Sequence, residues 1–443
     1  MVRPLLILAA LTATASAQSA VSKLPQVETA TLANGLQLAV LRTDAAPVVA
    51  VQVWYHVGSK DEPRDRRGSA HMFEHMMFKG TTHLRGEEHA QFLNGIGGYV
   101  NAATDEDATH FINTLPSDYL DFAVQLEAER MRNLLFRKAM IDTEREVVKE
   151  EIRQQENSPL AKGVLRFLEV AFTKHPYAWT AGGNLKDLDS TSPADLQKFY
   201  NAYYQPGNAM LVVVGKTSMA EVKASADKWF GAIPKAAEPP RPSAAAPEPP
   251  QTAKRKEVVE PGQIGLTLVG FHVPPAKDKD VYALQVASII LGSGESSRLK
   301  LRLKAIDPKT KRSLALDGGM EAVIREEPGM TIALGAFLDP AAADGVEAAI
   351  FDEIGKLAAK GPLPDELRKA KNQVQSGFVF SLENAQGLAE AIGRSWILTG
   401  SPTSFIKDVD QIEKVTAADV QRVVKQYMPA DHATIVVIPP KGR

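Results

Sequence analysis

Two similar segments, one near the middle of the chain and one near its end, limit what this sequence can fold into. Each has the pattern of an amphipathic helix followed by a strand rich in valine. Matched positions are separated by 224 residues (419 − 195), in the pairs Asp195 and Asp419, Gln197 and Gln421, Tyr203 and Tyr427, and Ala209 and Ala433. Repeated sequence units indicate repeated structural units. We therefore expect two homologous halves, each closed by the same helix–strand unit.

A proline- and alanine-rich segment lies between the two copies. Residues 236–253 contain no pattern of core-forming side chains, so we expect an extended, semi-rigid linker. The whole chain, at 443 residues, is too long for one ordinary hydrophobic core. The predicted domains are residues 22–235 and residues 254–443.

The first half contains the strongest chemical signal, the pattern His-x-x-Glu-His formed by His71, Glu74 and His75. The surrounding residues favour a helix, on which His71 and His75 lie one turn apart on the same face. Two imidazoles at this spacing can share one metal ion, and zinc suits them. The pattern in this order is the inverzincin signature. A chance match on a solvated helix face is the alternative, and a third ligand would distinguish the two.

A second helical pattern further along the chain offers that third ligand. It carries Glu144 and Glu151, which are seven positions apart and share one face. Catalytic zinc usually has three protein ligands and one open position. Glu151 is therefore the candidate third ligand, together with His71 and His75. The adjacent Glu150 points about 100° away around the helix and is expected to be a solvated charge.

These segments together resemble the pitrilysin family of metallopeptidases, which includes insulin-degrading enzyme and mitochondrial processing peptidase. The segments Phe78–Thr81 and Gly97–Ala102 also resemble family sequence, and Ile152 is the aliphatic residue that follows the third ligand there. The resemblance covers nearly all of the chain after its N-terminal segment. It implies an α+β fold of two homologous α/β-sandwich halves joined by the Pro-rich linker.

The resemblance also implies roles for individual residues. Zn²⁺ would be held by His71, His75 and Glu151, and Glu74 would be the general base in peptide-bond hydrolysis. Glu144 would orient a ligand or a water molecule.

Residues 97–104 and 108–115 have the pattern of two paired strands. If the first strand is a sheet edge near the metal, its free N–H and C=O groups can pair with an extended peptide. The resemblance implies that Asn101 contacts the substrate backbone there, and a routine hairpin with Asn101 serving the turn is the alternative. The other histidines of this half are not expected to be ligands, because His56 fits a sheet and His83 and His89 fit the surface.

The second half has no His-x-x-Glu-His pattern. Family members use an Arg and a Tyr, from this half or from a partner, to hold the substrate carbonyl. Arg302 is the candidate for the Arg, but an insertion follows it and Leu316 stands where Tyr is expected. Leucine cannot donate a hydrogen bond. We therefore expect a heterodimer in which a homologous, metal-free subunit supplies the Arg/Tyr pair.

The N-terminal segment and the composition indicate where the protein is located and which classes of site and partner are excluded. Residues 1–17 have one basic residue, a short apolar run and an Ala-x-Ala ending, which predicts a secretory signal peptide and a periplasmic or secreted protein. Neither this run nor any later segment is apolar for long enough to span a membrane. The absence of cysteine excludes disulfides and thiolate ligands. A net charge of −2 gives no basic surplus of the kind that indicates nucleic-acid binding.

The sequence thus predicts a secreted zinc metalloendopeptidase that hydrolyses peptides or unfolded segments inside a chamber, as the catalytic subunit of a heterodimer. The alternative from a different class is a non-catalytic assembly or peptide-binding subunit that keeps the fold. A secreted zinc-binding or peptide-carrier protein is a third interpretation.

Overall fold

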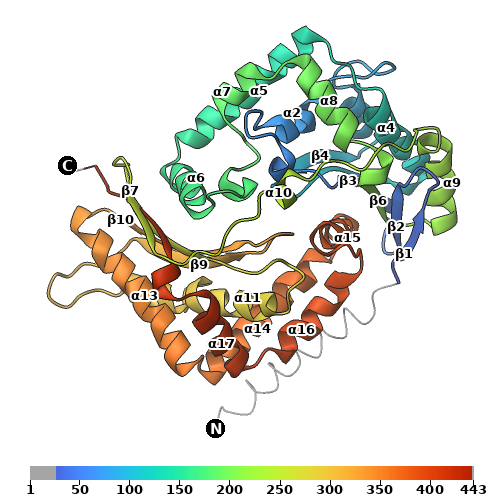
Figure 1. Ribbon diagram of the computed structural model, residues 1–443. Coiled ribbons are helices and arrows are strands. Elements are labelled where there is room, and N and C mark those ends of the chain that lie inside the picture. The colour runs from blue at the N-terminus through green and yellow to red at the C-terminus, as the bar shows by residue number, and fades with distance from the viewer. Residues whose placement is uncertain (1–25, 442–443) are drawn as a thin grey trace.

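The computed structural model describes residues 26–441, which form two halves that each contain one β-sheet and a set of covering helices (Figure 1). The strands of the first half are β1 (Glu28–Thr31), β2 (Gln37–Arg42), β3 (Val48–Tyr55), β4 (Tyr99–Thr104), β5 (Thr109–Pro116) and β6 (Ala209–Gly215). Its helices are α2 (Ser69–Met76), α3 (Glu88–Gly95), α4 (Leu120–Arg132), α5 (Lys138–Glu156), α6 (Pro159–Ala171), α7 (Leu185–Ser190), α8 (Pro193–Tyr203) and α9 (Met219–Phe230).

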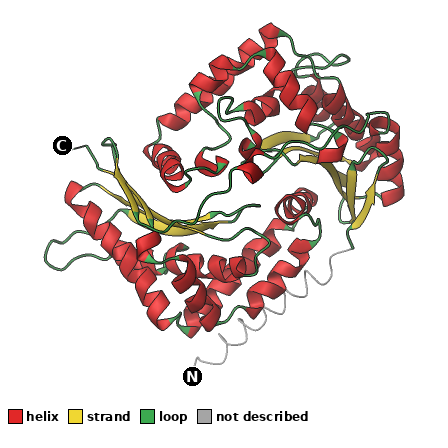
Figure 2. Cartoon of the chain, in the orientation of Figure 1, coloured by secondary structure: helices red, strands yellow, loops and turns green. Residues whose placement is uncertain are grey.

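The second half follows a short helix, α10 (Pro242–Ala245), in the connecting segment. Its strands are β7 (Arg255–Val258), β8 (Gly265–His272), β9 (Asp317–Val323), β10 (Met330–Phe337) and β11 (Thr434–Ile438). Its helices are α11 (Asp280–Gly292), α12 (Arg298–Lys304), α13 (Ala343–Lys360), α14 (Pro364–Ser381), α15 (Ala385–Thr399), α16 (Asp408–Lys414) and α17 (Ala417–Tyr427). The predicted α+β class with two similar halves is confirmed (Figure 2).

The two sheets have the same topology except that the first has one additional edge strand, β1. The strand orders are β1-β2-β6-β3-β5-β4 and β7-β11-β8-β10-β9. In each sheet, the strand that follows the repeated helix lies inside the sheet. The first such strand, β6, is parallel to β2 and antiparallel to β3, and the second, β11, is parallel to β7 and antiparallel to β8. The repeated helices α8 and α17 begin with the same capping box, formed by Ser192 with Asp195 and by Thr416 with Asp419. The repeat seen in the sequence is therefore one helix–strand unit used twice.

Helices cover both faces of the first sheet, and one of them comes from the second half. Along β3, Val51 and Val53 face the core of the first half, whereas Ala50 and Trp54 face α15. This division follows from the alternation of side chains along a strand. In α15, a Cβ atom on Gly393 would lie 2.2 Å from the Trp54 ring, so only glycine allows this close approach.

One face of the second sheet is likewise covered by a helix of the first half, α6. Phe167 and Leu168 of α6 pack with Leu266, Leu268 and Val436 in one buried cluster. Figure 1 shows α6 above the second sheet and α15 below the first, so each sheet is completed by the other half. This exchange gives the two halves shared buried apolar clusters, and such contacts favour one rigid unit over two moving domains.

The connecting segment between the halves is held by specific contacts along its length. Tyr203 donates from its hydroxyl to Pro240 O at 3.0 Å, and Ser243 in α10 is buried. The Glu248 carboxylate accepts hydrogen bonds from the backbone N–H groups of residues 173–175. The segment is held along the surface of the first half because its backbone and charged groups find partners there. The predicted signal peptide lies outside the described residues, and none of the described helices has the length and apolarity that a bilayer crossing requires.

Candidate metal centre

Helix α2 has one apolar face that packs into the core and an opposite face that carries the two histidines. Met72, Phe73 and Met76 are buried, and Phe73 packs among the aromatic rings of α8. His71 and His75 lie on the half-buried face, as the i, i+4 spacing predicts. Their ring centroids are 4.9 Å apart and the ring planes are nearly perpendicular, at 86°. The apolar stripe thus fixes the rotation of α2 and aims both imidazoles the same way.

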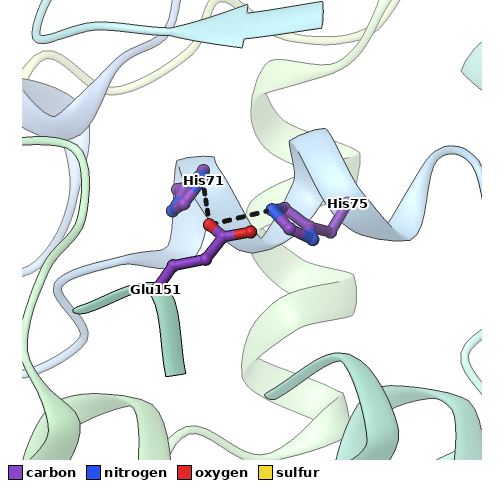
Figure 3. A group of neighbouring side chains, drawn as sticks. All are labelled: His71, His75 and Glu151. Carbon is purple, nitrogen blue, oxygen red and sulfur yellow. Dashed lines mark ion pairs between the residues drawn. The ribbon is translucent and has the colours of Figure 1, made fainter. Parts of the chain in front are cut away.

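Helix α5 brings the carboxylate of Glu151 between the two imidazoles (Figure 3). One oxygen, Oε2, lies 3.5 Å from His71 Nε2 and 3.5 Å from His75 Nε2. Helices α2 and α5 pack directly against each other, which bridges the long sequence separation. Among residues 26–441, these three form the only group of metal-ligand type whose donor atoms lie within 4.8 Å of one another.

The spacing of these donor atoms fits a tetrahedral zinc site. Bonds of ~2.1 Å to nitrogen and oxygen place neighbouring tetrahedral ligands about 3.4 Å apart. The two measured nitrogen–oxygen distances of 3.5 Å agree with this value. The donor set of two imidazoles and one carboxylate also suits zinc. His71 and His75 are mostly buried, at 15% and 17% side-chain exposure, while Glu151 is 42% exposed, so the site is open on the carboxylate side.

Glu144 stands behind His75, as its position on the same face of α5 predicted. Its Oε2 faces His75 Nδ1 at 3.6 Å, and its Oε1 pairs with Lys79 Nζ at 3.3 Å. Burial opposes protonation of His75, but Glu144 and Glu151 outweigh it and raise the pKa of His75. Burial would raise the pKa of Glu144, yet His75 and Lys79 lower it. This arrangement orients His75 with Nε2 toward the site.

His71 has a different environment from His75. Burial and the neighbouring His75 lower the pKa of His71 to about 4, against the opposing effect of Glu151. The imidazole is therefore neutral at ordinary pH, which is the form that binds metals. Its Nδ1 is buried and has no hydrogen-bond partner among the described residues.

Glu74 projects from α2 toward the edge strand. Burial raises the pKa of the Glu74 carboxyl, and the neighbouring Thr104, at the end of β4, and His75 partly offset this rise. Glu74 is not part of the three-residue metal group. A carboxyl that is beside the metal position but free of it, with a raised pKa, is suited to accept and return a proton.

Strand β4 is an edge strand, which meets the condition for peptide binding by strand addition. Among the strands of residues 26–441 it pairs only with β5, so the outer row of its backbone N–H and C=O groups has no partner strand there. Asn101 is exposed on β4 and donates to the hydroxyl of Tyr99 at 3.0 Å. It lies within the strand and not in the turn of the hairpin.

The described residues of the second half, 254–441, contain no comparable set of ligands. Helix α11, at the position that corresponds to α2, carries none. Arg302 is exposed on α12, and Leu316, immediately before β9, is 49% exposed. Between them, a bridge from Ile306 to Ser313 closes the predicted insertion into a loop.

One prediction about the remaining histidines is wrong. His83 is exposed as expected, but His89 is only 4% exposed and contacts the buried guanidinium of Arg130 at 3.0 Å. Burial and Arg130 lower the pKa of His89 well below its usual range. The buried Glu127 completes this cluster, at 3.0 Å from Arg130. The cluster depends on packing between α3 and α4, which no local pattern of His89 reports.

Sequence reasoning also missed residues that support the centre. Lys79 lies in the segment that resembles family sequence, and this could have drawn attention to it. Glu62 lies in the loop before α2 and holds the start of that helix, with Gly68 N at 2.9 Å and Ala70 N at 2.8 Å. Its spacing from the histidines has no helical or strand period, so no sequence pattern indicates its role.

Fold and site together define a member of a zinc-peptidase family, and comparison with known proteins agrees. Residues 38–179 match the family described as insulinase (peptidase family M16), and residues 190–374 match the one described as peptidase M16 inactive domain. The zinc protease PqqE of Helicobacter pylori is 31% identical over 423 residues, which cover 95% of this chain and 94% of PqqE. The chain therefore belongs to peptidase family M16, the pitrilysin family that its motifs resemble.

Two further relatives extend the comparison. The crystal structure of a protease from Helicobacter pylori has a TM-score of 0.87 and 29% identity, and the match covers 94% of this chain and 100% of that chain. A probable mitochondrial-processing peptidase subunit beta from Arabidopsis thaliana is 25% identical over 424 residues, covering 94% of this chain and 79% of that protein.

Proposed function

We propose that this protein is a zinc metalloendopeptidase that hydrolyses peptides or unfolded segments. The observation that carries the proposal is the meeting of His71, His75 and Glu151 at tetrahedral-ligand spacing, with Glu74 beside them. Two M16 relatives that are named zinc proteases support the proposal. Zn²⁺ held by these three residues would supply Lewis-acid polarisation of the scissile carbonyl and a water of lowered pKa.

The residues around the proposed zinc site have separate roles in proton transfer, ligand orientation and substrate binding. Glu74 accepts a proton from the attacking water and returns it to the leaving amine. Glu144 holds His75 in the orientation that directs its Nε2 at the metal position. The open edge of β4 receives an extended peptide by strand addition, and Asn101 contacts the peptide backbone there. An extended segment can meet these requirements, whereas a folded domain cannot.

We also propose that the active form is a heterodimer. Leu316 cannot donate a hydrogen bond, and the loss of such a donor to a developing oxyanion costs ~10²–10³ in rate. A homologous, metal-free subunit would supply the missing Arg/Tyr pair and close a chamber around the substrate. The relative named as a subunit of a processing peptidase supports this arrangement. The Ala-x-Ala ending before residue 18 supports export to a periplasm or to the exterior.

Zinc analysis and peptide cleavage together test the proposal. The protein should be purified from its native source, and zinc content and cleavage of unstructured peptides measured for the complex and for each separated chain. We expect about one zinc per chain, with full cleavage only by the complex. Full cleavage by the chain alone would refute the heterodimer, and stoichiometric zinc without cleavage in any form would favour the non-catalytic subunit.

A further inference from the structure

The start of the metal-bearing helix depends on one buried carboxylate. Helix α2 has eight residues, and its N-cap, Gly68, has a left-handed backbone with φ of 92° and no capping side chain. Both oxygens of Glu62, which is 1% exposed, instead accept hydrogen bonds from the N–H groups of Gly68 and Ala70. Ala70 immediately precedes His71. Glu62 thus satisfies N–H groups that a helix start leaves unpaired, directly beside a metal ligand.

Glu62 is itself fixed by the short turn that precedes it. The 3₁₀ helix η1 (Ser59–Asp61) is wholly buried, and its backbone is bound from several sides. The Ser59 and Lys60 N–H groups donate to the carbonyls of Asp105 and Glu106, at 3.1 Å each. The Trp179 indole N–H donates to Ser59 O at 3.0 Å. A shift of η1 would therefore move Glu62 and the first turn of α2 together.

The second half reaches η1 through the loop between β9 and β10, residues 324–329. Lys60 is 1% exposed and is held between Asp107 of the first half, at 2.8 Å, and Glu326 of this loop. Glu326 also contacts His56 Nε2 at 2.6 Å, and its N–H donates to Asp107 Oδ2 at 3.0 Å. An ammonium group buried in this way depends strongly on its charge partners.

We propose that the second half positions the metal centre through a relay from Glu326 to Lys60, through η1, to Glu62 and the start of α2. Glu326, Lys60 and Glu62 are positioning residues in this relay, because none of them touches the metal position. Through this relay the second half would contribute to zinc affinity, independently of any contact that it makes with substrate. The inference rests on the proposed function, since it concerns how the proposed zinc site is held.

Two conservative substitutions test the relay. Glu62→Gln keeps the size of the side chain, but its NH₂ group cannot accept one of the two N–H groups. Glu326→Gln removes the charge that the second half places on Lys60. Contacts that orient metal ligands typically change affinity by 10- to 100-fold when removed. We expect zinc affinity about 10-fold or more weaker in Glu62→Gln and several-fold weaker in Glu326→Gln. Chelator competition measures the affinity, and the visible spectrum of the Co²⁺-loaded protein reports ligand geometry.

The matched control is another ion pair between the halves. Glu257 of β7 pairs with Arg166 of α6 at 2.7 Å and is remote from η1 in the hydrogen-bond network. Glu257→Gln should leave both the zinc affinity and the Co²⁺ spectrum unchanged. The thermal unfolding of every metal-free variant separates a general loss of stability from an effect on the site.

A double variant adds a second criterion. If Glu326 acts through Glu62, then Glu62→Gln with Glu326→Gln should bind zinc no more weakly than Glu62→Gln alone. Wild-type zinc affinity and spectrum in Glu326→Gln, or additive losses in the double variant, would overturn the relay while leaving the proposed function intact. A wild-type protein without stoichiometric zinc would instead overturn the proposed function. If Glu62→Gln does not fold, Glu326→Gln alone still decides the question.

Discussion

Glu74→Gln is the substitution that most directly separates catalysis from metal binding. Glu74 is outside the group formed by His71, His75 and Glu151, so glutamine at this position leaves all three zinc ligands in place. Burial raises the pKa of the Glu74 carboxyl, which means that its charged form is disfavoured there. A neutral glutamine of the same size should therefore fold at least as stably as the wild type. The change removes the proton acceptor and little else.

The expected loss follows from the role of a general base. Such a group contributes ~10²–10⁴ in rate, or about 3–5 kcal/mol of activation free energy at 1.36 kcal/mol per tenfold. We expect kcat of the active complex to fall by this factor while KM changes little, because β4 and Asn101 are untouched. The zinc content should stay at the wild-type level.

The assay compares Glu74→Gln with two other Glu→Gln variants from α5. Glu151→Gln should lose both zinc and cleavage. Glu150→Gln should keep both, because Glu150 is exposed and, within the described part of the chain, its ion pair is with Arg153 on the same helix, at 3.2 Å. Cleavage of a fluorogenic peptide and zinc analysis of each preparation give the three outcomes. Normal cleavage by Glu74→Gln would refute the assignment of the base, and zinc retained at wild-type affinity by Glu151→Gln would refute the third ligand.

Three further predictions concern metal removal, packing and pH. Zinc at 100 times its dissociation constant should raise the free energy of unfolding by about 2.7 kcal/mol in the wild type and not in Glu151→Gln, as measured by urea unfolding with and without chelator. Phe167→Ala should lower the free energy of unfolding by about 3–5 kcal/mol, because this ring is fully buried between α6 and the second sheet, whereas Leu160→Ala, at an exposed position of the same helix, should cost far less. Burial and Arg394 lower the pKa of His110 to about 3 in the folded protein. Between pH 3 and 6.5 the unfolded chain therefore binds more protons at this residue than the folded chain does. The free energy of unfolding consequently decreases as the pH is lowered through that window. From pH 7 to pH 5 this group should cost about 2 kcal/mol, a loss that His110→Phe should abolish and that the exposed His83→Phe should not affect.

The local part of the candidate site could be predicted from the sequence. The spacing of His71 and His75 determines their common face on any helix, and the seven-residue spacing of Glu144 and Glu151 does the same on α5. These relations depend only on helix geometry, so they hold whatever surrounds the helix. The edge position of Asn101 was also foreseen, but from the family resemblance together with the strand pattern.

The non-local part could not be read in this way. No local pattern reports that the carboxylate of Glu151 comes within 3.5 Å of both imidazoles, because that distance depends on how α5 packs on α2. The burial of His89 and the capping of α2 by Glu62 likewise depend on neighbours that are distant in the sequence or have no periodic spacing.

The sequence by itself determined that this protein has two equivalent halves and that only the first carries a pattern of metal ligands. The physical reason is that a repeated helix–strand unit and an i, i+4 pair are properties of short segments. Only the tertiary structure decided that α6 and α15 are exchanged between the halves and that Glu326 of the second half pairs with Lys60, which lies in the turn before α2. Such contacts arise where buried surfaces must be matched across the whole chain, and residues far apart in sequence are brought together only by that packing.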